Sequence, residues 1–111
     1  MTRSSGILLP VSALPGPCGI GDLGTAAREF IDFLAAAGQR YWQILPLNPP
    51  DSAHSPYLSA STFAGSTDLL SPEPFMARGA LTLDEVRSVD WGGDPMRVDY
   101  GRVHAGKTAL W

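Results

Sequence analysis

The chain has 111 residues, of which 44% are hydrophobic and 17% charged, and its formal net charge is −3. This composition is typical of a globular protein and argues against disorder. No block of like charges occurs, so binding to nucleic acid or to an anionic membrane surface is not expected. No apolar run approaches the about 20 residues that a transmembrane helix needs.

The only cysteine is Cys18. A disulfide framework and a zinc site built on several thiolates are therefore excluded, and a reducing, cytoplasmic compartment is expected. The N-terminal apolar run could pass for a signal peptide, but it is interrupted too early by Pro10, Pro15 and Pro17. Cys18 could be a reactive thiol or an ordinary loop cysteine, and its setting favours the second interpretation.

A strand, a helix and a second strand are predicted in the first half of the chain. GILL (6–9) is a wholly apolar run, typical of a strand buried on both faces. Residues 25–37 repeat apolar side chains at helical spacing, with Thr25 as a plausible N-cap and Gly38 just past the end. YWQILPL (41–47) is rich in aromatic and aliphatic residues, as strands are. The order predicts a βαβ unit with parallel strands and a right-handed crossover.

The apolar stripe of the predicted helix is expected to consist of Ala26, Phe30, Phe33 and Ala37. Glu29 and Asp32 fall outside this stripe and should face solvent. Beyond the second strand, residues 48–79 are predicted to be mostly loop, with Leu69 and Leu70 as candidate anchors to a core.

Two further helices are predicted in the last third of the chain. Thr82 and Glu85 form a capping box before a short helix at about 83–89. Residues 98–111 predict a turn that leads into another helix. Two parallel strands and one crossover helix cannot close a sheet or cover both of its faces, so residues 1–111 are expected to be part of one larger domain.

GIGDLG (19–24) matches the dinucleotide-binding pattern G-x-G-x-x-G and lies between a predicted strand and a helix. However, a proline-containing stretch separates it from the strand, whereas the nucleotide-binding turn follows its strand directly. The second strand also ends in LPLN (45–48), without the acidic residue that would hold a ribose. Glycines that merely let the backbone turn are the favoured interpretation, and no cofactor is expected.

Glycosyl transfer needs two carboxylates that face each other, and the sequence shows no such pair. Asp84 and Glu85 belong to the first turn of a predicted helix, where the helix dipole explains them. Turn chemistry is the commoner explanation for the loop aspartates Asp22, Asp51, Asp68, Asp90, Asp94 and Asp99. His54 and His104 lack metal-ligand spacing, so no metal site is expected.

HSPYLSASTFAG (54–65) combines two aromatic residues, Tyr57 and Phe63, with several small hydroxyl residues. A sugar has an apolar C–H face and a rim of hydroxyls, which an aromatic ring and short polar side chains can bind. The alternative is that the two rings pin a long loop to the core. The composition of the loop leaves both interpretations open.

Three segments in this order and spacing resemble the start of the amylomaltases, the 4-α-glucanotransferases of glycoside hydrolase family 77. They are RSSGILLPVSALPGPCGIGDLG (3–24), FIDFLAAAGQRYWQILPL (30–47) and HSPYLSASTFAG (54–65), with VDYGRV (98–103) as a weaker match. The chain departs from the usual family residues at four places. They are Cys18 for an aromatic residue, His54 for Asp, Leu58 for Gln, and Ser66 with Thr67 for Asn-Pro.

The resemblance implies an α/β fold, the N-terminal portion of a TIM (β/α)8 barrel with a long catalytic-face loop and a helical insertion. Such a barrel needs about 250 residues, so the chain is expected to be incomplete. Residues 54–65 would follow the second strand, at the barrel face where active sites form. The matching tyrosine of the family lines the sugar cleft, so Tyr57, together with Ser55, is implied to bind substrate.

The family activity is retaining transfer of α-1,4-glucan segments to the 4-hydroxyl of an acceptor glucan or glucose. The resemblance therefore implies α-1,4-glucans and malto-oligosaccharides as partners. It places the catalytic carboxylates beyond Trp111, so these 111 residues are not expected to catalyse alone. Two alternatives remain, namely an α-glucan hydrolase of the amylase group and a non-catalytic carbohydrate-binding remnant.

Overall fold

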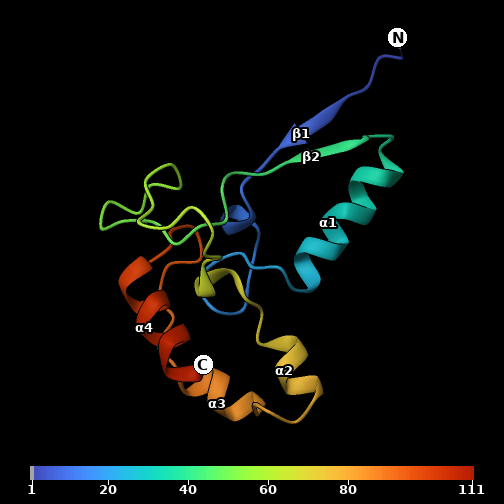
Figure 1. Ribbon diagram of the computed structural model, residues 1–111. Helices are drawn as coiled ribbons and strands as arrows, with labels where there is room; N and C mark the ends of the chain where they lie inside the picture. Colours follow the sequence, from blue (N-terminus) through green and yellow to red (C-terminus); the bar gives the residue numbers. More distant parts are fainter. Residues whose placement is uncertain (1) are drawn as a thin grey trace.

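The computed structural model describes residues 2–111, and its upper part in Figure 1 is a βαβ unit. The strands β1 (Gly6–Leu8) and β2 (Tyr41–Gln43) are joined by the helix α1 (Thr25–Ala36). The strands pair in parallel, with the register Gly6–Tyr41, Ile7–Trp42 and Leu8–Gln43. This arrangement confirms the predicted order and the predicted strand direction.

Both strands are shorter than predicted. The N–H of Leu9 still donates to the carbonyl of Gln43 at 3.0 Å, but Pro10 has no N–H with which to continue the ladder. The expected burial of β1 on both faces is wrong for the described chain, because Ile7 is 42% and Leu8 57% exposed. Within residues 2–111 the sheet has only two strands, so no further strand covers its edges.

The helix α1 has the predicted position but a different cap and a different buried face. Gly24 is its N-cap residue, not Thr25, and Gly38 adopts the left-handed conformation (φ 72°) just after its end, as predicted. The buried positions are Ala27 and Leu34, which flank the predicted stripe, whereas Phe33 is 63% exposed. The buried face of α1 is therefore turned away from the stripe that the sequence predicts, and part of that stripe faces solvent.

The second half of the chain contains short helical elements that lie below the sheet in Figure 1. The predicted loop 48–79 includes the 3-10 helix η2 (Thr67–Leu69) and the helix α2 (Glu73–Ala77). The helices α3 (Leu83–Ser88) and α4 (Tyr100–Leu110) follow. Both agree with the helices that the sequence predicts. No helix among residues 2–111 is long and apolar enough to cross a membrane.

The capping box of α3 is confirmed. Thr82 Oγ1 accepts a hydrogen bond from the N–H of Glu85 at 3.2 Å, and Glu85 Oε2 accepts one from the N–H of Thr82 at 2.7 Å. The predicted anchors of the preceding segment were less accurate. Leu69 is half-buried, but Leu70 is 41% exposed, whereas the neighbouring Ser71 and Pro72 are buried.

The core lies between the β1–α1 connection and α4, and Trp91 is wedged there between two glycines. A Cβ at Gly106 would lie 2.6 Å from a ring carbon of Trp91, and a Cβ at Gly19 would lie 2.4 Å from its carbonyl oxygen. The indole N–H of Trp91 donates to the carbonyl of Val86 at 3.0 Å. The close approach of three segments therefore depends on the absence of side chains at these glycines. The remaining buried apolar residues include Val11, Leu14, Cys18, Ile20 and Val103.

Candidate functional site

A pocket of about 220 Å³ lies beyond the carboxyl ends of the two strands. It is formed by the 3-10 helix η1 (Val11–Ala13), by residues 45–48 after β2, by the following loop and by the start of α4. Its apolar lining includes Val11, Ile20, Leu47 and Leu69, and its polar lining includes Asn48, His54, Asp68 and Tyr100. The carboxyl ends of parallel strands are where α/β folds commonly place their ligands.

The loop 48–65 is organised by its own polar groups. Asn48 Nδ2 donates to the carbonyls of Thr62 and Ala64 at 2.9 and 3.0 Å, and Ser59 Oγ donates to the carbonyl of Pro49 at 2.6 Å. The N–H of Ser66 donates to the carbonyl of Leu47 at 2.7 Å and closes the base of the loop. The hydroxyl of Ser59, one of the small hydroxyl groups considered for sugar binding, therefore stabilises the loop instead.

The two aromatic side chains of the loop are exposed. Tyr57 is 70% and Phe63 100% exposed, so the alternative that both rings pin the loop to a core is wrong for the described residues. Ser55 Oγ accepts a hydrogen bond from the N–H of Tyr57 at 3.3 Å. His54 and Pro56 line the pocket, whereas Ser55 and Tyr57, which alternate with them along the chain, are not among its lining residues. Sugar binding by Tyr57 and Ser55 stays a prediction.

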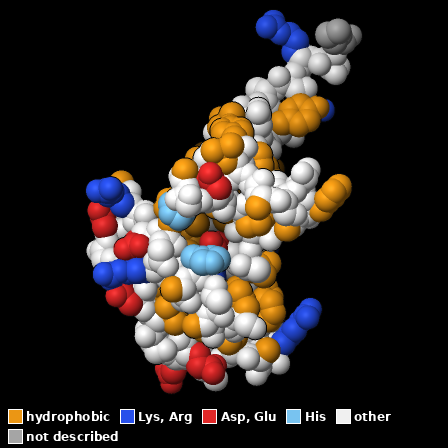
Figure 2. All heavy atoms as spheres, turned by 60° about the vertical axis from the view of Figure 1, so that its left-hand side comes forward, with side chains coloured by type: hydrophobic (Ala, Val, Ile, Leu, Met, Phe, Trp, Pro, Cys, Tyr) orange, Lys and Arg blue, Asp and Glu red, His pale blue; other side chains and the backbone are white. Residues whose placement is uncertain are grey.

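The loop is joined to α4 by an aromatic stack. The rings of His54 and Tyr100 have centroids 4.6 Å apart and an interplanar angle of 10°. His104 Nδ1 lies 3.1 Å from Asp68 Oδ1, and Figure 2 shows both imidazoles on one face of the molecule. Among residues 2–111, no three histidine, cysteine or acidic side chains are grouped so that they could hold a metal ion.

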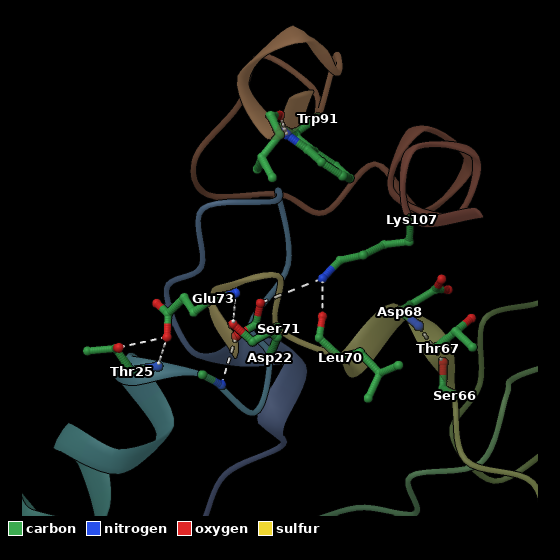
Figure 3. A network of polar contacts seen from close by, with 12 residues as sticks. Asp22, Thr25, Ser66, Thr67, Asp68, Leu70, Ser71, Glu73, Trp91 and Lys107 are labelled. Atoms are coloured by element: carbon green, nitrogen blue, oxygen red, sulfur yellow. Dashed lines mark hydrogen bonds and ion pairs between the residues drawn. The ribbon is translucent and has the colours of Figure 1, made fainter. Parts of the chain in front are cut away.

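A buried ion pair joins two distant segments, because Lys107 of α4 reaches the β1–α1 connection (Figure 3). Lys107 Nζ lies 3.6 Å from Asp22 Oδ2, and the two residues are 0% and 3% exposed. The same ammonium donates to the carbonyl of Leu70, and Asp22 Oδ1 accepts from the N–H of Gly24 at 2.9 Å. The interpretation of Asp22 as an ordinary turn residue was therefore incomplete.

Burial raises the pKa of Asp22, and the charge of Lys107 and the N–H of Gly24 oppose that rise. Asp22 Oδ2 has no hydrogen-bond partner within 3.5 Å among the described residues, and the ammonium of Lys107, 3.6 Å away, is the group that opposes its charge. Sequence reasoning missed Lys107 altogether. Its one available signal was that it is the only lysine of the chain, in a helix of weak amphipathicity.

Carboxylates also occupy the N-terminus of α1. Glu73 Oε2 accepts hydrogen bonds from the N–H of Thr25 at 2.8 Å and from its hydroxyl at 2.7 Å. Asp22 Oδ1 accepts a hydrogen bond from the N–H of Gly24. A pyrophosphate would need these N–H groups. This geometry favours the interpretation of GIGDLG (19–24) as a structural turn.

Cys18 is fully buried beside this ion pair. Burial raises the pKa of its thiol, and the charge of Lys107 partly opposes that rise. A raised pKa and no solvent access make a thiol unreactive. The preference for an ordinary cysteine over a reactive one therefore agrees with the geometry.

The structure thus defines an α/β piece with its candidate site at the carboxyl ends of two parallel strands. The chain belongs to the 4-alpha-glucanotransferase family, glycoside hydrolase family 77, whose profile matches residues 9–111. This match confirms the family that the sequence segments resemble.

Relatives of this family cover nearly the whole chain. A 4-alpha-glucanotransferase of Streptococcus pneumoniae is 42% identical over 108 residues, which are 97% of this chain and 21% of the relative. One of Thermus thermophilus is 46% identical over 107 residues, which are 96% of this chain and 20% of the relative. An amylomaltase of Streptococcus agalactiae in complex with acarbose superposes with a TM-score of 0.89 at 34% identity, over 98% of this chain and 23% of that one. The chain thus spans about a fifth of the relatives that it matches.

Proposed function

We propose that the complete protein is a 4-α-glucanotransferase and that this chain is the first part of its catalytic (β/α)8 barrel. The observation that carries the proposal is the register of β1 and β2 together with the position of the pocket. Both loops that follow the strands contribute to one pocket at the carboxyl ends, the face on which such barrels build their active sites. Residues 1–111 then belong to one catalytic domain, in a cytoplasmic protein.

In this proposal the loop 54–65 forms one wall of a glucan cleft. The exposed ring of Tyr57 stacks on a glucosyl C–H face, and the hydroxyl of Ser55 contacts the sugar rim. The acarbose complex of the S. agalactiae amylomaltase supports a saccharide as the ligand of this site. The preferred substrates are α-1,4-glucans and malto-oligosaccharides.

The reaction is a retaining double displacement. A carboxylate outside these 111 residues attacks the anomeric carbon, the C–O bond to the leaving sugar breaks, and an acid protonates the leaving oxygen. The 4-hydroxyl of a second glucan then attacks the glycosyl-enzyme bond and gives its proton to the same residue, now a base. This chain contributes glucan binding and no catalytic carboxylate.

Incubation of the full-length protein with maltotriose tests the proposal. A ladder of longer oligosaccharides is expected, whereas glucose and maltose alone would identify an α-glucan hydrolase. If neither product forms but maltoheptaose still changes the tryptophan fluorescence, the protein is a carbohydrate-binding remnant.

A chimera provides a matched control. The 111 residues replace the corresponding segment of the T. thermophilus enzyme, with which they are 46% identical over 107 residues. Transfer activity of the chimera is expected if this chain can serve as the first part of such a catalytic domain. A folded but inactive chimera would contradict the assignment.

A further inference from the structure

The conformation of the loop at His54 is unusual and must be held by its surroundings. His54 has a φ of 56°, and among residues 2–111 it is the only non-glycine residue with a positive φ. A side chain in the left-handed region persists where neighbouring contacts fix it. The N–H of His54 donates to the carbonyl of Asp51 at 3.0 Å, which closes a turn just before Ser55.

The ring of His54 rests on a well-anchored partner. Tyr100 is the first residue of α4, whose N-cap Asp99 accepts a hydrogen bond from the N–H of Arg102 at 3.1 Å. Further along the helix, Val103 and Lys107 are fully buried. The ring of Tyr100 therefore belongs to a fixed platform, and the stack at 4.6 Å couples the loop to it.

The hydrogen bonds within residues 51–58 do not by themselves fix this part of the loop to α4. The bonds of Asp51 with Leu58 and of Ser55 with Leu58 and Tyr57 all lie within the loop. They preserve the local shape of the loop, but they leave its orientation relative to the strands to other contacts. The stack on Tyr100 supplies such a contact one residue before Ser55 and three before Tyr57.

We propose that Tyr100 is a positioning residue for glucan binding, acting through its stack on His54 to orient the loop that carries Ser55 and Tyr57. This inference rests on the proposed function. Tyr100 touches no reacting atom in this scheme, so its loss affects the binding of glucan and leaves the chemical step intact. Its aromatic ring carries the effect, and its hydroxyl does not.

The test compares four variants of the full-length protein, namely Tyr100→Leu, Tyr100→Phe, His54→Asn and the double variant Tyr100→Leu/His54→Asn. With maltotriose as substrate, Tyr100→Leu and His54→Asn each raise KM about three- to tenfold, the worth of one aromatic pair. In both, kcat stays within about twofold of the parent. Tyr100→Phe preserves the ring that makes the stack, so its KM rises less than that of Tyr100→Leu. The double variant is no worse than either single variant, because both remove the same contact.

A second measurement does not depend on activity. Chymotrypsin cleaves after exposed aromatic residues, and Tyr57 and Phe63 both lie in this loop. Cleavage there is expected to be about three- to tenfold faster in Tyr100→Leu and His54→Asn than in Tyr100→Phe. His54→Asn leaves α4 unaltered and tolerates a positive φ, so it tests the stack even if Tyr100→Leu folds poorly.

The outcomes separate the two proposals. If the parent protein forms no oligosaccharide ladder, the proposed function fails, and the cleavage rates still report whether the stack holds the loop. If the parent is active and Tyr100→Leu and His54→Asn match it in KM and in cleavage rate, the positioning role is overturned. An effect of Tyr100→Phe as large as that of Tyr100→Leu would also overturn it, because it would assign the effect to the hydroxyl.

Discussion

Lys107 Nζ lies 3.6 Å from Asp22 Oδ2, and this contact joins α4 to the connection between β1 and α1 inside the core. Both side chains are almost completely removed from water. Taking two charges out of water is unfavourable, and their attraction together with the carbonyl of Leu70 offsets that cost. The stability of this part of the fold therefore depends on both partners being present.

Replacement of Lys107 by methionine should lower the free energy of unfolding by about 3–5 kcal/mol, because it leaves the carboxylate of Asp22 buried and unpaired. Chemical denaturation measures the change. Arg97→Met is the matched control, since Arg97 is exposed, and it should cost no more than about 0.5 kcal/mol. The double variant Lys107→Met/Asp22→Asn should recover part of the loss, and a double variant worse than Lys107→Met would contradict the pairing.

The raised pKa of Asp22 predicts a specific pH dependence. Its ordinary value is 3.8, and burial raises it in the folded protein. The folded state therefore holds this proton more tightly than the unfolded chain does. As pH rises from 3.8 to the raised pKa of the folded state, the stability relative to Asp22→Asn should fall. Above the raised pKa the difference should be constant. Stability that instead rises with pH relative to Asp22→Asn would show that the charge of Lys107 outweighs burial.

The capping box of α3 predicts an opposite pH dependence. Hydrogen bonds from the backbone and the hydroxyl of Thr82 lower the pKa of Glu85 below 4.5, its ordinary value. The contribution of Glu85 to stability is thus present above pH 4.5 and is lost as pH falls through the lowered pKa. Thr82→Ala should cost about 1 kcal/mol at neutral pH. In combination with Glu85→Gln, the loss should be less than the sum of the two single losses.

Cys18 should resist alkylation in the folded protein. Its side chain is fully buried, and burial raises the pKa of the thiol above 9.0, its ordinary value. Iodoacetamide at about pH 8 should label it only after denaturant is added, as mass spectrometry of tryptic peptides would show. Rapid labelling without denaturant would contradict the buried position.

The proposed sugar contact of Tyr57 predicts different effects of two substitutions. Tyr57→Leu removes the ring and should lower kcat/KM for malto-oligosaccharides about tenfold, whereas Tyr57→Phe retains the stacking face and should lose much less. Initial rates of ladder formation by the full-length protein measure both. Equal activity of Tyr57→Leu and the parent would exclude Tyr57 from the glucan site.

The features that were predicted correctly depend on residues close together in the chain. The box of Thr82 and Glu85 closes over three positions, and Gly38 ends α1 because only glycine adopts its left-handed backbone without strain. The alternation of an apolar run, an amphipathic segment and a second apolar run likewise predicted the parallel βαβ unit. These preferences arise within one or two turns of backbone, so the sequence carries them directly.

Contacts between distant segments were not predictable in this way. The N-terminus of α1 was assigned to Thr25, but the group that satisfies it is Glu73, which is 48 positions away. The local sequence predicts a turn role for Asp22 and gives no sign of Lys107, which lies against it in the fold, and the stack of His54 on Tyr100 has no sequence signal. The burial and the charge of a side chain depend on which neighbours surround it, and only the folded arrangement of the segments decides those neighbours.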